Sequence, residues 1–310
     1  MGLEIAPIEG AAFGGLITGL DAAAIDDAAA TRLRKASLDH HGVLCFRFDK
    51  LLTVDELNAL TAVFGENELA PGMITGYGRG VTGGQPERSV EEQIADLRGR
   101  GIDPYLMFIG NVDPRTGERR EVDDKFFGEW EWHSDMSYIP APPTYSLLHS
   151  RQVPADGGDT GFCSQVLAAQ TLPAGLRARV EGLGIKHDST YSSNGIVRPG
   201  MVEPASPMEA IGEVHPILRR VPGADQEALF LGRRTNGYVP GLSLEESEAL
   251  LDELWAHATQ PQFRYRHRWS VGEVVVWDNR VVMHRRHPVN PDEARFMWRT
   301  QTRGEIVVPV

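Results

Sequence analysis

The chain has 310 residues, of which 41% are hydrophobic, and a formal net charge of −12 at pH 7. That length suits one large domain, and we predict a single domain over residues 1–310. The acidic balance excludes an extended nucleic-acid surface, although a few local arginines could still bind a small anion. No apolar run reaches the length of a membrane span.

The two cysteines, Cys45 and Cys163, lie far apart and form no Cys-x-x-Cys pair. Neither a disulfide framework nor a cysteine zinc site is therefore expected, which fits a reducing compartment. The N-terminus lacks the basic and apolar regions of a signal peptide, and Ala6 stands where N-myristoylation requires Ser or Thr. We predict a cytoplasmic protein without a lipid anchor.

The first hundred residues contain predicted helices around one strand. Periodicity and composition predict helices at 22–38, 54–64 and 87–100, and a strand at 43–48. Thr53 is the expected N-cap of the second helix. Glycines crowd residues 72–84, which we predict to be a loop; no G-x-G-x-x-G or G-K-[ST] pattern supports phosphate binding there.

From about residue 105 the chain becomes rich in short apolar segments separated by glycine and proline. These segments predict strands at 106–109, 145–151, 161–162, 228–231, 263–269, 273–277 and 295–302. A helix is predicted at 243–257, with Leu244, Leu250, Leu251 and Leu254 facing inward. The predicted fold class is mainly β with flanking helices, as a sandwich or a jelly roll.

The first candidate site is the segment Trp132-His133-Ser134-Asp135. On a strand, residues two apart point the same way, so His133 and Asp135 would share a face. One imidazole and one carboxylate are two of the three ligands in a 2-His-1-carboxylate iron site. A hydrogen-bonded pair at a strand end is the alternative interpretation of these two residues.

The second candidate site combines a histidine with a later pair of arginines. An apolar strand runs into a polar turn after Trp277 and then presents His284. If the following segment is a strand, Arg295 and Arg299 share one face about 13 Å apart. Buried arginines need anionic partners, and their fork geometry suits carboxylates. A solvated edge strand is the alternative, and it is what we predict for residues 264–269.

Together these motifs resemble the taurine/2,4-D dioxygenase family of iron(II)- and 2-oxoglutarate-dependent enzymes. The family's H-x-D, proline pair, G-G-D-T, W-D-N-R, distal histidine and an arginine eleven positions later occur here in that order. They are His133 to Asp135, Pro142-Pro143, Gly157 to Thr160, Trp277 to Arg280, His284 and Arg295. Segments 145–148, 257–260 and 265–269 are most similar to the branch that cleaves 2,4-dichlorophenoxyacetate.

The resemblance implies a double-stranded β-helix, a distorted jelly roll, and a role for each matching residue. His133, Asp135 and His284 would ligate iron(II). Thr160, Trp277 and Arg295 would form the 2-oxoglutarate pocket, whereas Arg299, Met136 through its backbone amide, and Asn111 would contact the substrate. Residues 66–131 are longer than in typical members and would form a lid or insert. The family also implies a homo-oligomer.

The implied reaction uses O2 and 2-oxoglutarate to hydroxylate, and in some cases thereby cleave, a small anionic organic substrate. An aryloxyalkanoate such as 2,4-dichlorophenoxyacetate is the first expectation, and an alkyl sulfonate, a sulfate or another carboxylate is the alternative. Two other classes remain open: a zinc hydrolase with the same ligands, and a non-catalytic jelly roll with a structural metal. Neither of them uses Thr160, Arg295 or Arg299.

Overall fold

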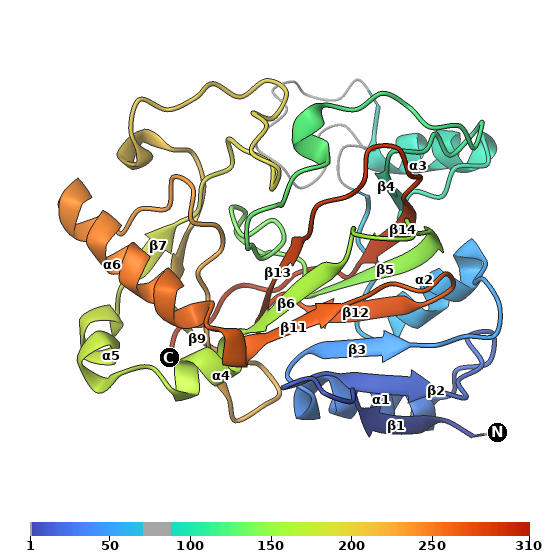
Figure 1. The fold of residues 1–310 in the computed structure, drawn as a ribbon, viewed down its shortest axis with the longest axis horizontal. Helices are drawn as coiled ribbons and strands as arrows, with labels where there is room; N and C mark the ends of the chain where they lie inside the picture. The colour runs from blue at the N-terminus through green and yellow to red at the C-terminus, as the bar shows by residue number, and fades with distance from the viewer. Residues whose placement is uncertain (1, 71–87) are drawn as a thin grey trace.

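The structure is a computed structural model that describes residues 2–70 and 88–310, so the predicted loop at 72–84 lies outside the described residues. The described chain is mainly strand with flanking helices (Figure 1). The strands are β1 (Glu4–Pro7), β2 (Gly15–Thr18), β3 (Val43–Phe46), β4 (Met107–Gly110), β5 (Tyr145–Gln152), β6 (Thr160–Ser164), β7 (Gly184–Lys186), β8 (Val214–Pro216), β9 (Leu218–Arg220), β10 (Glu227–Leu229), β11 (Arg264–His267), β12 (Val274–Asp278), β13 (Val282–Arg286) and β14 (Phe296–Gln301). The helices are α1 (Asp27–Asp39), α2 (Val54–Ala62), α3 (Val90–Gly99), α4 (Gln165–Gln170), α5 (Ala174–Val180) and α6 (Leu244–Ala258), with 3-10 turns η1 (Asp124–Phe126), η2 (Pro207–Glu209) and η3 (Pro261–Phe263).

Two sheets organise the strands. The main sheet has the order β1-β2-β3-β12-β5-β14-β4, and the second sheet has the order β11-β6-β13. β12 lies in the middle of the main sheet, paired antiparallel with β3 and β5, and all five of its residues are buried. A strand that is buried on both faces has a continuous apolar sequence, and residues 274–277 of β12 have such a sequence.

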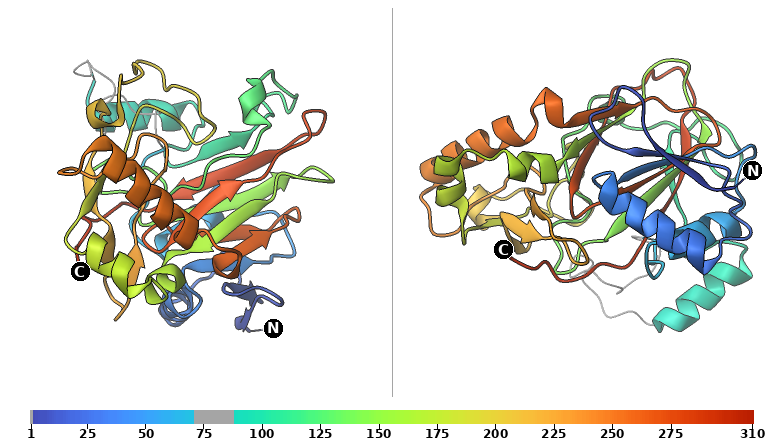
Figure 2. Two further views of the ribbon diagram at one scale, coloured as in Figure 1. Left: turned by 60° about the vertical axis from the view of Figure 1, so that its left-hand side comes forward. Right: turned by 90° about the horizontal axis from the view of Figure 1, so that it is seen from below.

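Three apolar clusters divide the fold into layers because side chains alternate along each strand. Val274 and Val276 of β12 point outward, into a cluster that includes Leu33 of α1 and Leu57 of α2. Val275 points inward, into a cluster shared with both sheets. Cys163 and Met283 of the second sheet face a third cluster with α4, α5 and α6. Helices therefore flank two facing sheets (Figure 2).

Helix ends follow local capping chemistry. Thr53 and Glu56 form the capping box that opens α2, as predicted from Thr53, and such a cap stabilises a helix by about 1 kcal/mol. The first helix starts five residues later than predicted, because the Asp26 carboxylate accepts the amide of Ala29. In α6, Leu250, Leu251 and Leu254 are buried as predicted, whereas Leu244 is 38% exposed at the first helical position.

The segment 66–131 is more than a covering loop. Residues 107–110 of this segment form β4, which pairs with β14 at the edge of the main sheet. Its charged portion forms α3, which opens with a Ser89–Glu92 capping box. The strand geometry assumed for His133 and Asp135 is not present: His133 forms only isolated bridges, and Asp135 begins a turn. The polar edge predicted at 264–269 is confirmed in β11, where Arg264 and Arg266 are exposed.

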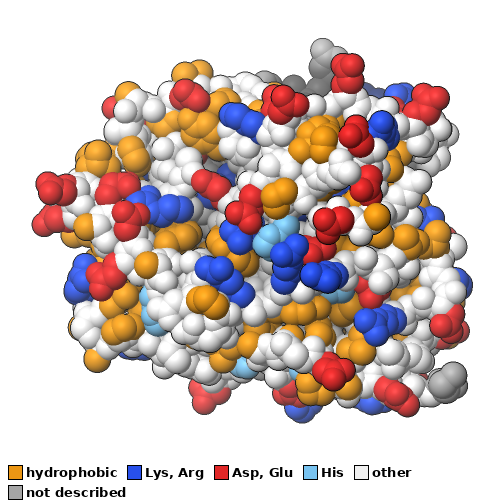
Figure 3. Space-filling view, in the orientation of Figure 1, with side chains coloured by type: hydrophobic (Ala, Val, Ile, Leu, Met, Phe, Trp, Pro, Cys, Tyr) orange, Lys and Arg blue, Asp and Glu red, His pale blue; other side chains and the backbone are white. Residues whose placement is uncertain are grey.

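The surface carries mixed charges. On the face shown in Figure 3, acidic and basic side chains are interspersed, and a small group of basic side chains lies near its centre. Within the described ranges, every helix is too short or too polar to span a membrane.

A buried histidine in the main sheet predicts a pH dependence of folding stability. Nε2 of His149 accepts the amide of Leu52 (3.2 Å), and Nδ1 donates to the carbonyl of Glu273 (3.1 Å). Burial lowers the pKa of His149 from 6.5 to about 4, because a proton on Nε2 would face that amide in a dry site. The unfolded chain therefore binds more protons than the folded chain between these pH values.

We expect the free energy of unfolding to fall as pH drops from 6.5 to 4, with His149 contributing roughly 2 to 3 kcal/mol. Urea unfolding of the wild type and His149→Gln at pH 7 and pH 4.5 measures this contribution. The variant should lose less stability than the wild type between the two pH values. Parallel losses in both proteins would contradict the assignment to His149.

Candidate active site

Three buried side chains converge between the two sheets. His133 and His284 exchange two backbone hydrogen bonds, of 3.0 and 2.8 Å, which bring β13 against the segment before the turn. Oδ1 of Asp135 lies 3.8 Å from Nε2 of His133 and 3.6 Å from Nε2 of His284. One ligand atom from each residue can thus reach a common point, as a metal ion requires.

Hydrogen bonds to neighbouring groups fix the orientation of two of the ligands, His133 and Asp135. Nδ1 of His133 lies 2.7 Å from the carbonyl of Glu131, so it carries the proton and Nε2 keeps its lone pair. Oδ2 of Asp135 accepts the hydroxyl of Ser146 at 2.7 Å and contacts Nη2 of Arg299. These contacts leave Oδ1 directed at the two imidazoles.

Burial and charge set the protonation of these ligands. Burial lowers the pKa of His133 well below its usual value and lowers that of His284 to about 4. Burial alone would raise the pKa of Asp135, but Arg299 and the two histidines outweigh it, so the carboxyl pKa is lowered. Neutral imidazoles beside a carboxylate are the protonation states that metal binding needs.

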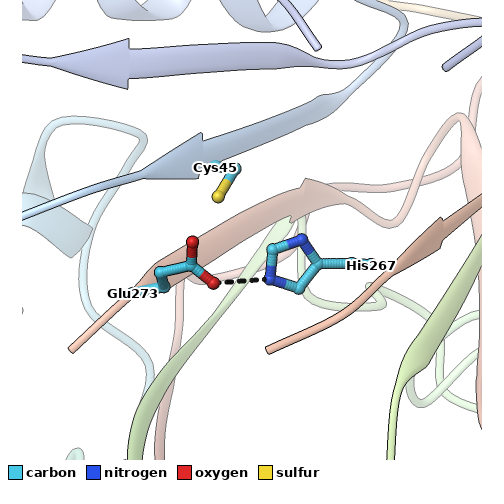
Figure 4. Close-up of side chains that lie close together, drawn as sticks. All are labelled: Cys45, His267 and Glu273. Carbon is cyan, nitrogen blue, oxygen red and sulfur yellow. Dashed lines mark ion pairs between the residues drawn. The ribbon is translucent and has the colours of Figure 1, made fainter. Parts of the chain in front are cut away.

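A second group of metal-type ligands lies elsewhere in the fold, where Cys45, His267 and Glu273 meet (Figure 4). Its carboxylate already has partners on both oxygens: Arg47 at 3.1 Å on Oε1, and the amide of Ser270 at 2.9 Å on Oε2. Burial raises the pKa of the Cys45 thiol to about 12, which keeps it protonated. We therefore assign the metal to His133, Asp135 and His284.

A cavity of about 520 Å³ opens beside the triad. Five of the predicted site residues line it together with the ligands: Met136, Thr160, Trp277, Arg295 and Arg299. Thr160 accepts a hydrogen bond from Trp269, and the ring of Trp277 lies 4.6 Å from the ring of His284, tilted by 49°. Met136 adopts φ +48°, an uncommon conformation for a side-chain-bearing residue that turns the chain directly after Asp135.

Arg295 is a buried cation whose donors are not all used. Only 1% of the residue is exposed, and Nε and Nη1 have no hydrogen-bond partner among the described residues. Burial lowers its pKa to about 10, with Asp159 opposing the shift, so the guanidinium stays charged at pH 7. A buried charge with free donors at a cavity wall fits a carboxylate ligand.

The structure gives Asn111 a different role from the predicted substrate contact. Asn111 does not line the cavity; its Oδ1 accepts the amide of Arg295 at 2.8 Å and its Nδ2 donates to the carbonyl of Glu293 at 2.9 Å. Both ends of its amide are thus occupied in holding the backbone of Arg295. Asn111 is a positioning residue for the arginine.

Gly110 allows β4 to approach the backbone of Arg295 closely, and this contact supports a prediction. A Cβ at Gly110 would lie 1.8 Å from the carbonyl oxygen of Arg295, and its φ is +149°. We expect Gly110→Ala to displace Arg295 and raise the KM for 2-oxoglutarate roughly 10- to 100-fold, because a shift of about 1 Å at a binding group has effects of that size.

Steady-state kinetics with varied 2-oxoglutarate checks the effect of Gly110→Ala. Gly99→Ala is the matched control, because a Cβ there meets no atom within 4 Å. An unchanged KM in the Gly110 variant would mean that β4 does not position Arg295.

Three further arginines line the cavity and were missed from sequence: Arg198, Arg233 and Arg286. Arg198 lies 4.1 Å above the ring of Tyr138, and Arg233 donates to Ser193 at 2.9 Å. Both come from irregular segments that no periodicity marks. Arg286 did carry a signal, because it lies two residues after His284 and therefore on the same face of β13.

Two imidazoles and one carboxylate beside a cavity with a buried, partly unpaired arginine fit a non-haem iron oxygenase that takes an anionic cosubstrate. The chain belongs to the family described as "Taurine catabolism dioxygenase TauD, TfdA family", whose model matches residues 4–301.

Named relatives agree with this membership. The alpha-ketoglutarate-dependent 2,4-dichlorophenoxyacetate dioxygenase of Cupriavidus pinatubonensis is 34% identical over 273 residues, 87% of this chain and 88% of the relative. The (S)-phenoxypropionate/alpha-ketoglutarate-dioxygenase of Sphingobium herbicidovorans is 29% identical over 97% of this chain and 95% of that protein. The crystal structure of AAD-2 with Mn(II) and N-oxalylglycine has a TM-score of 0.76 at 26% identity, covering 100% of both chains.

The protein is therefore a dioxygenase that depends on alpha-ketoglutarate, which is 2-oxoglutarate, and uses Fe(II) and O2. This result decides against the zinc hydrolase and the non-catalytic metal-binding jelly roll.

Proposed function

We propose that the protein hydroxylates a small aryloxyalkanoate, of the 2,4-dichlorophenoxyacetate kind, at a carbon close to iron. The observation that carries this proposal is the mixed lining of the cavity. Aromatic and aliphatic side chains from the segment 107–130 form one part of it, and five arginines are among the residues that line the remainder. An apolar ring joined to a carboxylate has the matching pair of surfaces.

In this proposal the described residues divide the work of binding. His133, Asp135 and His284 hold iron(II) through three side chains, which leaves positions for other ligands. Thr160 and Arg295 bind the distal carboxylate of 2-oxoglutarate, and Trp277 forms a wall of that pocket. When bound, iron and 2-oxoglutarate together activate O2 and supply the oxidising power of the reaction.

Arg299 connects the metal site to the substrate site. Its Nη2 contacts Asp135 and lies 3.3 Å from Oγ of Ser146, while Nε has no partner among the described residues. We infer that Arg299 holds the ligand carboxylate with one nitrogen and offers another donor toward a substrate anion. Met136, whose turn follows Asp135 directly, would place its backbone on the same side.

The fold suits this division. We infer that the two facing sheets form the double-stranded β-helix, and that residues 1–310 are one domain. Of the lid predicted at 66–131, the described residues 107–130 would cover part of the cavity, since Phe126 and Trp130 line it. A cytoplasmic location agrees with the buried free thiols of Cys45 and Cys163. A homo-oligomer is also proposed, and light scattering tests it.

Substrate-stimulated formation of succinate from 2-oxoglutarate tests the proposed substrate. Aryloxyacetates should stimulate turnover over the background without substrate, and phenol release should accompany cleavage of the ether. Alkyl sulfonates and sulfates are the comparison set, because a sulfonate could also occupy an arginine site. Stimulation by these compounds alone would overturn the aryloxyalkanoate assignment while leaving the oxygenase intact.

A further inference from the structure

Arg286 faces the proposed cosubstrate pocket from the second sheet. In the register of β6 and β13 it lies directly opposite Thr160, and it shares a face with His284. The neighbouring Arg285 points away, toward Glu129 (3.1 Å) and the ring of Trp132 (4.6 Å). The strand thus sends one arginine into the cavity and the next one out of it.

The guanidinium of Arg286 is held in place without a counterion. Its Nη2 donates to the carbonyls of Phe126 and Gly128, the latter at 2.9 Å. The rings of Phe126 and Trp130 each lie 4.7 Å from its central carbon. These contacts use one nitrogen and pack the group against two aromatic rings whose centroids lie 6.0 Å apart, so they fix its direction.

The remaining donors of Arg286 are buried and unused. Only 4% of the residue is exposed, and Nε and Nη1 have no hydrogen-bond partner among the described residues. The described chain also provides no carboxylate within ion-pair distance of it. Arg295, lining the same cavity, has the same two nitrogens unpaired. Two like charges in a dry site repel each other, and an anion between them would relieve that repulsion.

We propose that Arg286 and Arg295 together bind the distal carboxylate of 2-oxoglutarate, and that this pair restricts the cosubstrate to 2-oxo acids with a second carboxylate. The inference rests on the proposed assignment of Thr160 and Arg295 to that carboxylate. Arg286 lies across from Thr160, whereas Arg299 lies against Asp135 on the side assigned to the substrate. Phe126 and Trp130 would then link the segment 107–130 to cosubstrate binding through Arg286.

The test compares two ligands that differ only at the distal end. Iron(II)-loaded protein is titrated calorimetrically under argon with 2-oxoglutarate and with 2-oxopentanoate, which has a methyl group in place of the distal carboxylate. The wild type should bind 2-oxoglutarate more tightly. Arg286→Gln should weaken 2-oxoglutarate roughly 10- to 100-fold, the size of a charge-assisted hydrogen bond, and leave 2-oxopentanoate unchanged.

Controls separate this role from a structural one. Arg285→Gln, one residue away on the opposite face, should bind both ligands like the wild type. Arg286→Lys keeps the charge without the fork and should recover part of the affinity; it also carries the test if Gln at this position prevents folding. The KM for the primary substrate should change less than the affinity for 2-oxoglutarate in either Arg286 variant.

The possible outcomes test the role of Arg286 separately from the assignment of Thr160 and Arg295 to the distal carboxylate. Equal wild-type affinity for the two ligands would overturn the assigned carboxylate pocket itself. If Arg295→Met no longer binds 2-oxoglutarate more tightly than 2-oxopentanoate but Arg286→Gln still does, only the role proposed for Arg286 is overturned. The role of Arg286 would also be overturned if Arg286→Gln lowered the affinity for both ligands equally, or if it raised only the KM for the primary substrate.

Discussion

Asp135→Ala is expected to abolish substrate-dependent succinate formation, with a fall of more than about 100-fold. The reason is that Asp135 is the only carboxylate among the three converging ligands. Loss of a group that merely supports a metal ligand costs about 10- to 100-fold, and loss of a ligand should cost more. The side chain also compensates Arg299, so its removal leaves that guanidinium beside the metal site without its anion.

Iron binding and turnover should be measured together on the purified variant. Ser146→Ala is the informative companion, because it keeps all three ligands and removes the hydroxyl that donates to Oδ2 of Asp135 and accepts from Asn279 and Gln301. We expect this variant to retain iron with a loss of about 10-fold or more in turnover. Asp156→Ala, on an exposed loop, should behave as the wild type. An Asp135→Ala protein that keeps most of its iron affinity and turnover would remove Asp135 from the site.

The relation of His133 to Asp135 could be predicted from sequence, whereas the way in which they are held could not. A spacing of two places side chains on one side of an extended chain, and both residues do face the same point. The strand assumed in that argument is absent, because His133 pairs only through isolated bridges to His284 and Arg233. Those partners are distant in sequence, and their approach depends on how the sheets pack.

The arginines and Asn111 also show that sequence periodicity predicts which side chains share a face but not which distant residues they contact. The position of Arg295 and Arg299 on one face followed from strand periodicity, and both line the cavity. Asn111 was expected at the substrate because its strand leads toward the site, but its side chain ends on the backbone beside Arg295. The register between β4 and β14 decides that contact, and no local pattern encodes a register between distant strands.

Arg295→Met should weaken the binding of 2-oxoglutarate and at the same time stabilise the ligand-free protein. Removing one member of a buried, hydrogen-bonded charge pair costs about 2 to 5 kcal/mol, so the Kd for 2-oxoglutarate should rise roughly 30-fold to several thousand-fold. Without ligand, however, the wild type keeps a charged side chain buried with Nε and Nη1 unpaired. An apolar side chain of similar length removes that cost.

We therefore expect the ligand-free Arg295→Met protein to melt at a higher temperature than the wild type, although it no longer binds 2-oxoglutarate well. Calorimetric melting with and without the cosubstrate measures both effects, and 2-oxoglutarate should stabilise only the wild type. Arg268→Met, whose side chain is 86% exposed, is the control and should change neither quantity. A residue that serves only the fold would lose stability when replaced. A gain in stability that accompanies a loss of affinity is therefore the specific signature of an arginine kept for its ligand.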